Sequence, residues 1–146
     1  MKTERFATAD DLSPVTVPAL EDSRGQLFVA ELPLIVPFAI TRIFWVIGVP
    51  KNVRRGGHAH RRCHQFLICA SGAVEVEIFD GTAKRRFDLT TGMGLHVPPG
   101  IWAEQSYGTP ETVVVVLCDR PYEAEDYIRD LVSFTAFRDN APGRAQ

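Results

Sequence analysis

The segment that most restricts the fold is a predicted hairpin near the middle of the chain. Over Ala73–Phe79, valine or isoleucine alternates with glutamate. Side chains two apart in a strand share a face, so this alternation predicts a strand with one buried face and one face in solvent. Asp80-Gly81 follows, a pair that favours a tight turn because both residues can adopt positive φ. The chain is then expected to return as a strand through Lys84–Leu89.

Short β-type runs continue on both sides of this hairpin. Val, Ile and Thr together number 33 and cluster in runs between turn residues, which is typical of an all-β sandwich or barrel. The run at 39–47 is apolar on both faces, so we expect a strand that is covered on both sides. Further strands are expected at 65–70, 95–97, 101–104 and 113–118.

The N-terminal part of the chain is expected to be extended. Pro14 and Pro18 disfavour a central strand, so the segment up to about residue 24 is predicted to be an arm or an edge strand. The sequence has 146 residues and shows no internal repeat, low-complexity tract or linker. A chain of this length predicts one domain, over residues 1–146.

The C-terminal part is predicted to contain the helix of the fold. The segment 122–131 follows a proline and carries its acidic residues early, as the first turn of a helix favours. Phe134 and Phe137 lie beyond it and are expected to dock this helical tail, about residues 122–138, on the β domain.

Charge and hydropathy exclude several kinds of function. The formal net charge is −2, which does not match the basic surface that binds nucleic acid. The longest apolar stretch, Leu32–Ile40, is interrupted by prolines and is too short to span a membrane. The first residues lack the apolar core and the cleavage site of a signal peptide, so a cytoplasmic protein is expected.

Three cysteines agree with a reducing compartment. Their odd number, without a Cys-x-x-Cys pair, argues against a disulfide framework and against a cysteine-rich zinc site. Cys69 and Cys118 lie in apolar runs and are interpreted as small buried residues. Cys63 precedes His64, but neighbours on a strand point to opposite faces, so catalysis by Cys63 is disfavoured.

The densest chemistry lies between Arg54 and Gln65, a stretch with three of the four histidines. His58 and His60 are two apart on a predicted strand, so they share a face and project into the barrel if this strand lines it. An imidazole has an ordinary pKa near 6.5 and can accept or donate a proton at neutral pH. The pair therefore favours removal of a proton next to a carbonyl, followed by reprotonation.

Arginines surround this histidine pair. Thirteen of the 16 basic residues are Arg, and two lie on each side of the histidines, at 54–55 and 61–62. Arginine forks bind phosphate oxygens in a bidentate way, which favours a phosphorylated or diphosphate substrate. Solvated strand ends that keep sheet edges apart are an equal alternative. The sequence has neither a Walker loop nor a dinucleotide fingerprint, and no cofactor is expected.

These residues resemble the first motif of the cupin superfamily, which reads His-x-His, four residues, Glu, six residues, Gly. Here the frame is His58, His60, Gln65 and Gly72. The spacing fits, but Gln65 replaces an acidic metal ligand of the metal-binding cupins, and a neutral amide is a poor ligand for a transition metal.

The second cupin motif, Gly, five residues, Pro-x-Gly, two residues, His, corresponds to Gly92, Pro98, Gly100 and Ala103. Ala103 replaces the last histidine ligand, and a methyl group cannot bind a metal. The resemblance implies an all-β, cupin-type jelly-roll or double-stranded β-helix barrel, and the two replacements imply that it has no catalytic metal.

The order of segments is similar to the dTDP-sugar 3,4-ketoisomerases over nearly the whole chain. The resemblance implies a homodimer that moves the ketone of dTDP-4-keto-6-deoxyglucose from C4 to C3 through an enediol. The resulting dTDP-3-keto-6-deoxyhexose would serve later transamination to a 3-amino sugar, for lipopolysaccharide or S-layer glycans. The segments that carry the resemblance are Arg24-Gly25-Gln26-Leu27, Pro37-Phe38 with Ile40 and Arg42, Arg55-Gly56 with His58 and His60, His64-Gln65, Ser71-Gly72, Gly94-Leu95 with Val97-Pro98-Pro99, Ile101-Trp102, and Tyr122 with Asp126-Tyr127-Ile128-Arg129.

The resemblance also assigns roles to residues. The family keeps its acid/base pair at His58 and His60, and we expect His58 as the base at C3 with His60 as its partner; the reverse assignment stays open. Arg42 is expected to meet the diphosphate and Gln65 to form hydrogen bonds in the pocket. Trp102 is expected to be a wall for the sugar or the base, with core packing as an equal alternative. The predicted substrate-binding residues are Arg42, Arg55, Gln65 and Trp102.

Two positions depart from this family. Its members often carry Tyr where this chain has Phe44 and an aromatic residue where it has Gly57. Either departure could change the face of C4 that is reprotonated, or the hexose.

Three rival functions stay open for a chain of this kind. A sugar-nucleotide 3,5-epimerase on the same scaffold would exchange the C3 and C5 protons while the ketone stays in place. A non-enzymatic, sugar-sensing cupin would use the histidines for binding alone. A metal-dependent oxygenase would carry a stoichiometric transition metal.

Overall fold

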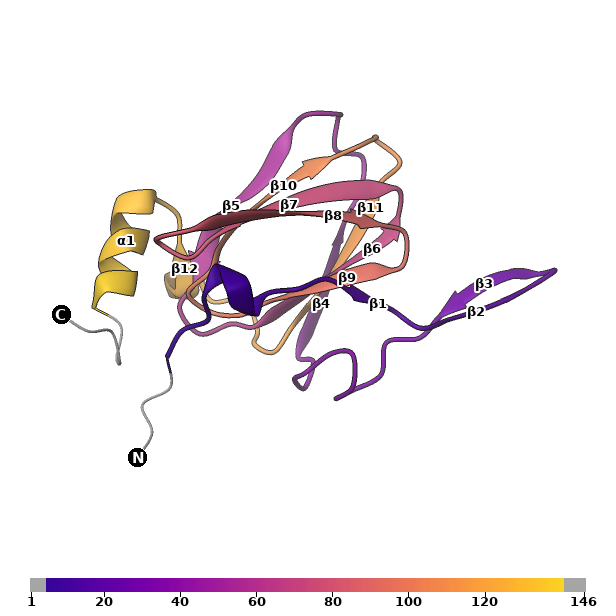
Figure 1. Cartoon of the computed structure of the whole chain (residues 1–146), viewed down its shortest axis with the longest axis horizontal. Coiled ribbons are helices and arrows are strands. Elements are labelled where there is room, and N and C mark those ends of the chain that lie inside the picture. The colour runs from indigo at the N-terminus through magenta and orange to yellow at the C-terminus, as the bar shows by residue number, and fades with distance from the viewer. Residues whose placement is uncertain (1–4, 141–146) are drawn as a thin grey trace.

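Two five-stranded antiparallel sheets form the body of the computed structural model, which describes residues 5–140 (Figure 1). One sheet contains, in spatial order, β1 (Val15–Thr16), β9 (Met93–Val97), β6 (Gln65–Ser71), β11 (Val113–Cys118) and β4 (Arg42–Val46). The other contains β12 (Tyr127–Ile128), β5 (Arg54–His60), β10 (Trp102–Tyr107), β7 (Ala73–Phe79) and β8 (Lys84–Thr90). Residues 1–4 and 141–146, the outer parts of the predicted domain, lie outside the described residues.

The core lies between the inner faces of the two sheets. Leu67, Leu95 and Val114 from the first sheet form one buried cluster with Val76 and Leu89 from the second. This arrangement is a jelly-roll barrel, and it confirms the predicted all-β fold with one short C-terminal α-helix.

The central hairpin has the predicted strands but a longer turn. β7 buries Val74, Val76 and Ile78, as the alternation predicts, and pairs with β8. Four residues connect the two strands, and the carboxylate of Asp80 accepts hydrogen bonds from the backbone N–H groups of the two residues that precede β8, at 2.8 Å each. Asp80 therefore acts as an acceptor that closes the loop.

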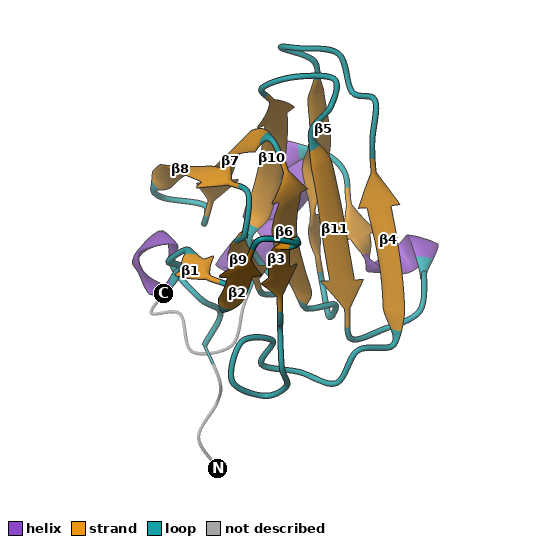
Figure 2. Cartoon of the chain, turned by 90° about the vertical axis from the view of Figure 1, so that its right-hand side faces the viewer, coloured by secondary structure: helices purple, strands orange, loops and turns teal. Residues whose placement is uncertain are grey.

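β4 is covered on one face only, which corrects the expectation for the run at 39–47. It ends its sheet beyond β11, as Figure 2 shows. Phe44 and Val46 pack against the core, whereas Ile43, Trp45 and Ile47 are 54%, 65% and 63% exposed. The apolar pattern of this run thus leaves an uncovered outer face in the single chain.

The helix begins later than predicted. The segment expected to be helical forms a 3₁₀ turn, Ala124–Asp126, and then strand β12, because Tyr127 and Ile128 pair with the end of β5. The α-helix α1 spans Leu131–Asp139, and the side chain of Asp130 caps it by accepting a hydrogen bond from the backbone N–H of Ser133, at 2.7 Å. Long-range strand pairing overrides the local helical preference here.

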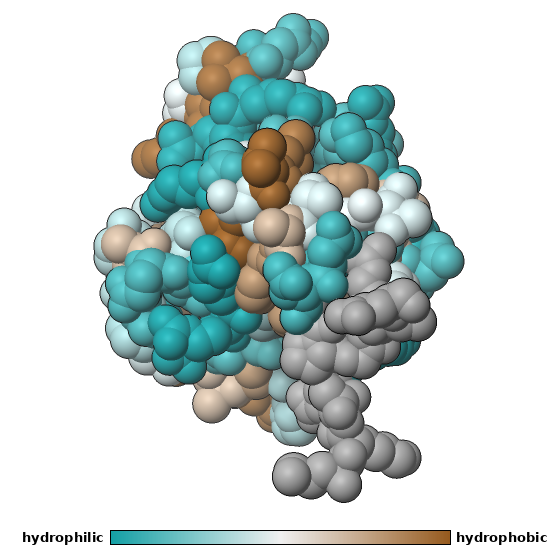
Figure 3. Space-filling model, turned by 90° about the vertical axis from the view of Figure 1, so that its left-hand side faces the viewer, coloured by the Kyte–Doolittle hydropathy of each residue, from teal (hydrophilic) through white to brown (hydrophobic). Residues whose placement is uncertain are grey.

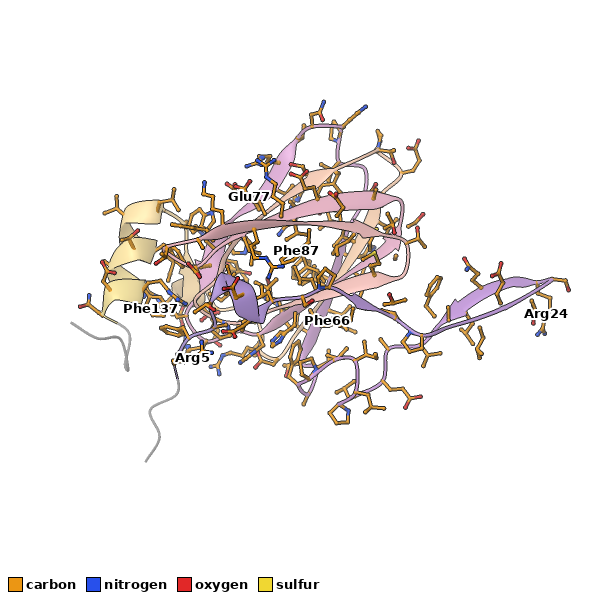
Figure 4. The ribbon with its side chains drawn as sticks, viewed as in Figure 1. Arg5, Arg24, Phe66, Glu77, Phe87 and Phe137 are labelled. Carbon is orange, nitrogen blue, oxygen red and sulfur yellow. The ribbon has the colours of Figure 1, made fainter. Side chains whose placement is uncertain are left out.

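Helix α1 packs against the outer face of the second sheet. Phe134 is fully buried, with its ring centroid 5.7 Å from that of Trp102 and 5.8 Å from that of Phe79. A guanidinium nitrogen of Arg138 donates to the backbone oxygens of Ala7 and Gly100, at 2.9 and 3.0 Å. The helix therefore ties the N-terminal segment to the barrel, and Figure 4 shows Arg5 and Phe137 at this same end. The surface here is mainly hydrophilic, with separate apolar spots (Figure 3).

The N-terminal segment starts with a 3₁₀ turn, Ala9–Asp11, and continues through the edge strand β1 to a two-stranded hairpin. β2 (Ala19–Asp22) and β3 (Gly25–Phe28) form this arm, which projects from the body with Arg24 at its tip (Figures 1 and 4). Leu20 and Leu27 are 69% and 59% exposed. Apolar side chains on such an arm have no cover from the chain's own body.

No helix within residues 5–140 has the length and apolar character that a membrane crossing requires.

Replacement of Phe134 by Ala is expected to lower the free energy of unfolding by about 3 to 5 kcal/mol, because it leaves a cavity under α1. Urea denaturation measures this change. Val132, 83% exposed on the same helix, is the matched control, and Val132→Ala should change stability by less than about 0.5 kcal/mol. Equal effects of the two substitutions would show that α1 does not depend on this packing.

Candidate active site

Strand β5 directs His58 and His60 into the barrel. His58 lies opposite Ala103, a member of the barrel core, whereas Ala59 between the histidines is fully buried on the other side with Phe134. His60 is 4% exposed, and the two imidazole centroids are 5.1 Å apart. The predicted pairing of these histidines on one face agrees with the geometry.

Two glycines bend β5 just before the histidines. Gly56 and Gly57 have φ of 82° and 72°, in the left-handed region that favours glycine. The strand pairing shifts here, since Ala103 lies opposite His58 while the next residue of β10 lies opposite Gly56. A Cβ on Gly56 would lie 2.8 Å from the backbone oxygen of Ala103. The glycine pair therefore forms a β-bulge.

The bulge changes which side chains face the barrel. Arg55 lies opposite Gln105 and turns to the same side as His58, although the two are three residues apart. Arg54 faces outward and donates a hydrogen bond to Glu104 at 2.7 Å. Of the two arginines at 54–55, only Arg55 is on the barrel side, and it lies nearer the start of β5 than His58 does.

Asp126 holds His60 in one orientation. Its carboxylate lies 2.8 Å from Nδ1 of His60 and accepts hydrogen bonds from the backbone N–H groups of Arg62 and Cys63, at 2.7 and 3.3 Å. Burial alone would raise the pKa of Asp126, but these hydrogen bonds keep its pKa below the ordinary value. An ionised carboxylate can only accept, so Nδ1 of His60 carries the proton.

The other ring nitrogen of His60 is free to act as a base. Nε2 is buried and has no hydrogen-bond partner among the described residues. Burial lowers the pKa of His60, although Asp126 acts in the opposite direction. Burial, with a further contribution from His60, lowers the pKa of His58 to about 4. Both imidazoles are therefore neutral near pH 7, and Nε2 of His60 offers a lone pair inside the barrel.

Strand β12 adds an aromatic wall to this site. The ring centroid of Tyr127 lies 4.4 Å from that of His60 and 5.0 Å from that of His58. The guanidinium of Arg129 stacks on the outside of the Tyr127 ring at 4.4 Å, and Tyr122 lies 5.5 Å from it. The histidine pair is thus enclosed by the segment that was expected to be helical.

Arg42 and Gln65 approach from the opposite sheet. The guanidinium of Arg42 lies between the rings of Phe44 and Tyr122, at 5.6 and 5.7 Å, and its Nε is buried without a partner among residues 5–140. Arg42 also lies close enough to His60 to lower its pKa. Gln65 is 8% exposed, and both side chains donate to the sulfur of Cys118. The structure therefore brings four predicted residues together: His58, His60, Arg42 and Gln65.

Trp102 does not belong to this group. Its side chain packs with Ala59, Ile128 and Phe134, on the face of the second sheet opposite to the histidines. Alternation along β10 places Ala103 inside the barrel and Trp102 outside it. The structure therefore favours core packing, which was the alternative interpretation of this residue.

One group of three residues among the described ones could hold a metal ion. One ligand atom from each of His60, Cys63 and Asp126 lies within 4.8 Å of the others. Nδ1 of His60 and both oxygens of Asp126 take part in the hydrogen bonds given above. The possible ligand atoms of His60 and Asp126 are therefore already occupied by hydrogen bonds within the protein.

His64 and His96 form a second pair, outside the barrel. Nδ1 of His64 lies 2.9 Å from Nε2 of His96, and Phe38 packs on both rings. A cavity of about 340 Å³ borders His64, and another of about 550 Å³ borders His96. Arg5 and Pro98 line both cavities, and neither lining includes His58 or His60. This pair is separate from the candidate active site.

Asp126 and Tyr127 are site residues that were not predicted, although both lie in a segment that carried the family resemblance. A helix was expected over this segment, and a helix would not pair with β5. Asp126 and Tyr127 reach His60 only because β12 pairs with β5. Their presence in a matched segment was the available signal.

The chain is similar to known proteins over most of its length. The family model described as FdtA, WxcM-like, C-terminal, matches residues 10–139. A curated protein of Aneurinibacillus thermoaerophilus, TDP-4-oxo-6-deoxy-α-D-glucose-3,4-oxoisomerase, is 32% identical over 117 residues, which cover 80% of this chain and 84% of that protein.

Solved structures agree with this match. QdtA, a sugar 3,4-ketoisomerase from Thermoanaerobacterium thermosaccharolyticum solved with TDP, has a TM-score of 0.84 and 27% identity, over 90% of this chain and 97% of that chain. NovW, a 4-keto-6-deoxy sugar epimerase from Streptomyces spheroides, has a TM-score of 0.72 and 15% identity, over 84% of this chain and 70% of that chain. The likeness to NovW shows the fold alone.

The free energy of unfolding is expected to fall in acid because folding partly buries His58 in its neutral form. The pKa of this residue falls from 6.5 to about 4 on folding. Between these values the unfolded chain binds a proton that the folded chain does not, so the contribution is present above pH 6.5 and is lost as the pH falls toward 4. From pH 7.5 to pH 5 the loss is about 2 kcal/mol.

Urea denaturation at the two pH values checks this contribution. The difference in stability between the wild type and His58→Gln should change by about 2 kcal/mol from one pH to the other. His96, whose pKa burial also lowers to about 4, offers a second comparison through His96→Gln. A pH-independent difference for His58→Gln would contradict the assignment of a buried neutral imidazole.

Proposed function

The chain belongs to the FdtA family of WxcM-like proteins and is an enzyme of the cupin-fold TDP-sugar 3,4-ketoisomerase class; on this premise we propose that it converts dTDP-4-keto-6-deoxyglucose to a dTDP-3-keto-6-deoxyhexose. One observation carries the proposal. Inside the barrel, a buried acceptor nitrogen of His60 and a buried donor nitrogen of Arg42 both lack partners within residues 5–140. A bound molecule with an acidic C–H group and anionic oxygens would satisfy both.

Moving the ketone requires a proton to leave C3 and a proton to arrive at C4. Loss of the C3 proton and protonation of the C4 oxygen give an enediol. Loss of the proton on the C3 oxygen, with protonation of C4, then gives the C3 ketone and the C4 hydroxyl. The net change moves protons alone, so neutral imidazoles suffice as carriers.

His60 is proposed as the base at C3, and His58 as its partner in proton relay. This reverses the order first expected, because Asp126 contacts His60 and leaves its Nε2 as the available base. The carboxylate also stabilises the imidazolium that forms when His60 takes the proton. His58 lies beside it, 5.1 Å between centroids, and carries the second proton.

Arg42 and Gln65 are proposed to bind the substrate. Arg42 lies on the inner face of β4, and its Nε can donate to an oxygen of the diphosphate. Gln65 lies two strands away with its amide inside the barrel. Arg55 lies nearer the start of β5, on the same face as His58, and is proposed as a second anion contact.

The enzyme is proposed to be a homodimer. The outer face of β4 exposes Ile43, Trp45 and Ile47 at the edge of the sheet, and the β2–β3 arm exposes two leucines. A contiguous apolar surface on an edge strand favours association with a second copy. Contact with a second copy would cover the face of β4 that the single chain leaves open.

The product is proposed to enter dTDP-3-amino-deoxysugar synthesis, for a glycan such as lipopolysaccharide or an S-layer glycan. A 3-ketone is the group that transamination requires, which supports this order of reactions. A cytoplasmic location is proposed as well, supported by three free cysteines.

Incubation with dTDP-4-keto-6-deoxyglucose in deuterated water tests the function. NMR is expected to show a 3-keto product with deuterium at C4. Deuterium at C5 with the ketone still at C4 would contradict the proposal and favour a 3,5-epimerase. Binding without any turnover would favour a sugar-sensing protein.

His60→Asn is expected to lower kcat about 1,000-fold, because the base is lost. His64→Asn is the matched control, since His64 faces the outside of the barrel, and it should keep the wild-type rate. Steady-state kinetics measure both variants. A His60→Asn variant with near wild-type kcat would remove His60 from the mechanism.

Trp45→Glu is expected to convert the dimer to a monomer, because it places a charge in the proposed apolar interface. Size-exclusion chromatography with light scattering measures the mass. Val132→Glu, at an exposed position on α1, is the control and should leave the dimer intact. A wild-type chain that elutes as a monomer at micromolar concentration would contradict the proposed assembly.

A further inference from the structure

Cys118 occupies the row of residues that links the two predicted substrate-binding side chains. It is the last residue of β11, the strand between β6 and β4. The strand register places Cys118 opposite Gln65 on one side and opposite Arg42 on the other. Residues opposite one another share a face of the sheet. The thiol therefore lies between Arg42 and Gln65, inside the barrel, and is fully buried.

The sulfur accepts hydrogen bonds from both neighbours. Nη2 of Arg42 lies 3.6 Å from Sγ of Cys118, and Nε2 of Gln65 lies 3.7 Å from it. A guanidinium and an amide nitrogen can only donate. Cys118 thus serves as a common acceptor, which a thiolate does better than a thiol because hydrogen bonds to a charged acceptor are stronger.

Cys118 is the acceptor that the structure offers to Nη2 of Arg42. The guanidinium of Arg42 lies between the rings of Phe44 and Tyr122, and it forms no ion pair with a carboxylate of residues 5–140. Arg42 is partly buried, and burial acts against its positive charge, whereas the contacts with Cys118 and Tyr127 act in favour of it and raise the pKa of Arg42. The groups near it that could become negative are the sulfur of Cys118 and the hydroxyl of Tyr127. Of these two types of group, a thiol loses its proton more readily.

The surroundings of Cys118 favour the negative sulfur. A hydrogen bond with Cys63, followed by those from Arg42 and Gln65, holds the pKa of Cys118 below its ordinary value, although burial acts against this. The pKa of Cys63 is raised, so Cys63 is the member of the pair that keeps its proton. Titratable or charged groups from several elements surround this cluster. They are Arg42 on β4, His60 on β5, Cys63 just before β6, Asp119 just after β11, Asp126 just before β12, and Tyr127 on β12.

We propose that Cys118 is a positioning residue of the active site, whose negatively charged sulfur holds the Nη2 side of Arg42 and the amide of Gln65 so that Nε of Arg42 stays directed to the substrate. The inference rests on the proposed function, because it takes Arg42 and Gln65 as the groups that bind the nucleotide sugar. It changes the interpretation of Cys118 from a small buried residue to the counter-ion of Arg42.

The first experiment measures the charge on the sulfur without any substrate. A thiolate absorbs near 240 nm, so a pH titration of the folded wild type should show one thiolate below pH 7.5. Cys118→Ser should remove this absorbance. Cys69→Ser is the matched control: Cys69 is also fully buried, its pKa is raised by burial, and the signal should stay. Arg42→Gln should move the midpoint to higher pH.

The second experiment measures substrate binding. Cys118→Ser is expected to raise KM about tenfold with kcat within twofold, because Arg42 loses its fixed orientation while the histidines stay in place. Cys118→Asp restores a negative charge beside Arg42 and should recover most of the affinity. A merely structural cysteine would give the opposite order, since Ser fits the space of Cys better than Asp does.

The outcomes separate the two proposals. Loss of the 240 nm signal in Cys118→Ser but not in Cys69→Ser supports the charged sulfur, whatever product the enzyme forms. A wild type without a thiolate below pH 7.5, or an unchanged midpoint in Arg42→Gln, overturns the inference and leaves the ketoisomerase assignment intact. If Cys118→Ser does not fold, the titrations of the wild type and of Arg42→Gln decide alone.

Discussion

The buried carboxylate of Asp126 is the interaction on which the rest of the site depends. It accepts hydrogen bonds from the ring of His60 and from two backbone N–H groups just after β5. These contacts join the C-terminal segment to the turn that follows the histidines. One group thus fixes the tautomer of the base, closes the end of β5 and holds β12 in register. Removing it would disturb the chemistry and the local fold together.

Local alternation explains which parts of the fold could be predicted. The strand at Ala73–Phe79 is found as predicted because its own side chains distinguish a buried face from a wet one. Trp102 could not be placed in this way, because its neighbour Ala103 is also apolar and the alternation does not say which of the two faces the inside of the barrel. In the structure Ala103 faces inward and Trp102 outward. β12 could not be predicted either, because Tyr127 and Ile128 become a strand only by pairing with the distant end of β5.

The pairing of the histidines was predictable from the strand pattern, whereas Arg42 and Gln65 were predicted only through the family resemblance, and Asp126 was given no role. His58 and His60 share a face by simple periodicity, which any regular strand preserves. Arg42, Gln65 and Asp126 converge on them from three other elements, so their meeting depends on the closure of the barrel. Both histidines are neutral, and Nε of Arg42 has no partner among residues 5–140, so the barrel offers an anionic ligand a free hydrogen-bond donor on a guanidinium.

The β-bulge at Gly56-Gly57 changes which alternate residues of β5 face the inside of the barrel. Upstream of it the odd-numbered position 55 faces inward, and downstream the even-numbered positions 58 and 60 do. Deletion of one of the two glycines would place Arg55 two residues before His58, so an unbroken alternation would keep both on the inner side and Arg54 on the outer side. A straight strand of unchanged length would instead turn Arg54 inward and Arg55 outward. The extra residue and the bulge therefore compensate each other, and a chain that loses one must lose the other if Arg55 is to stay on the side of the histidines.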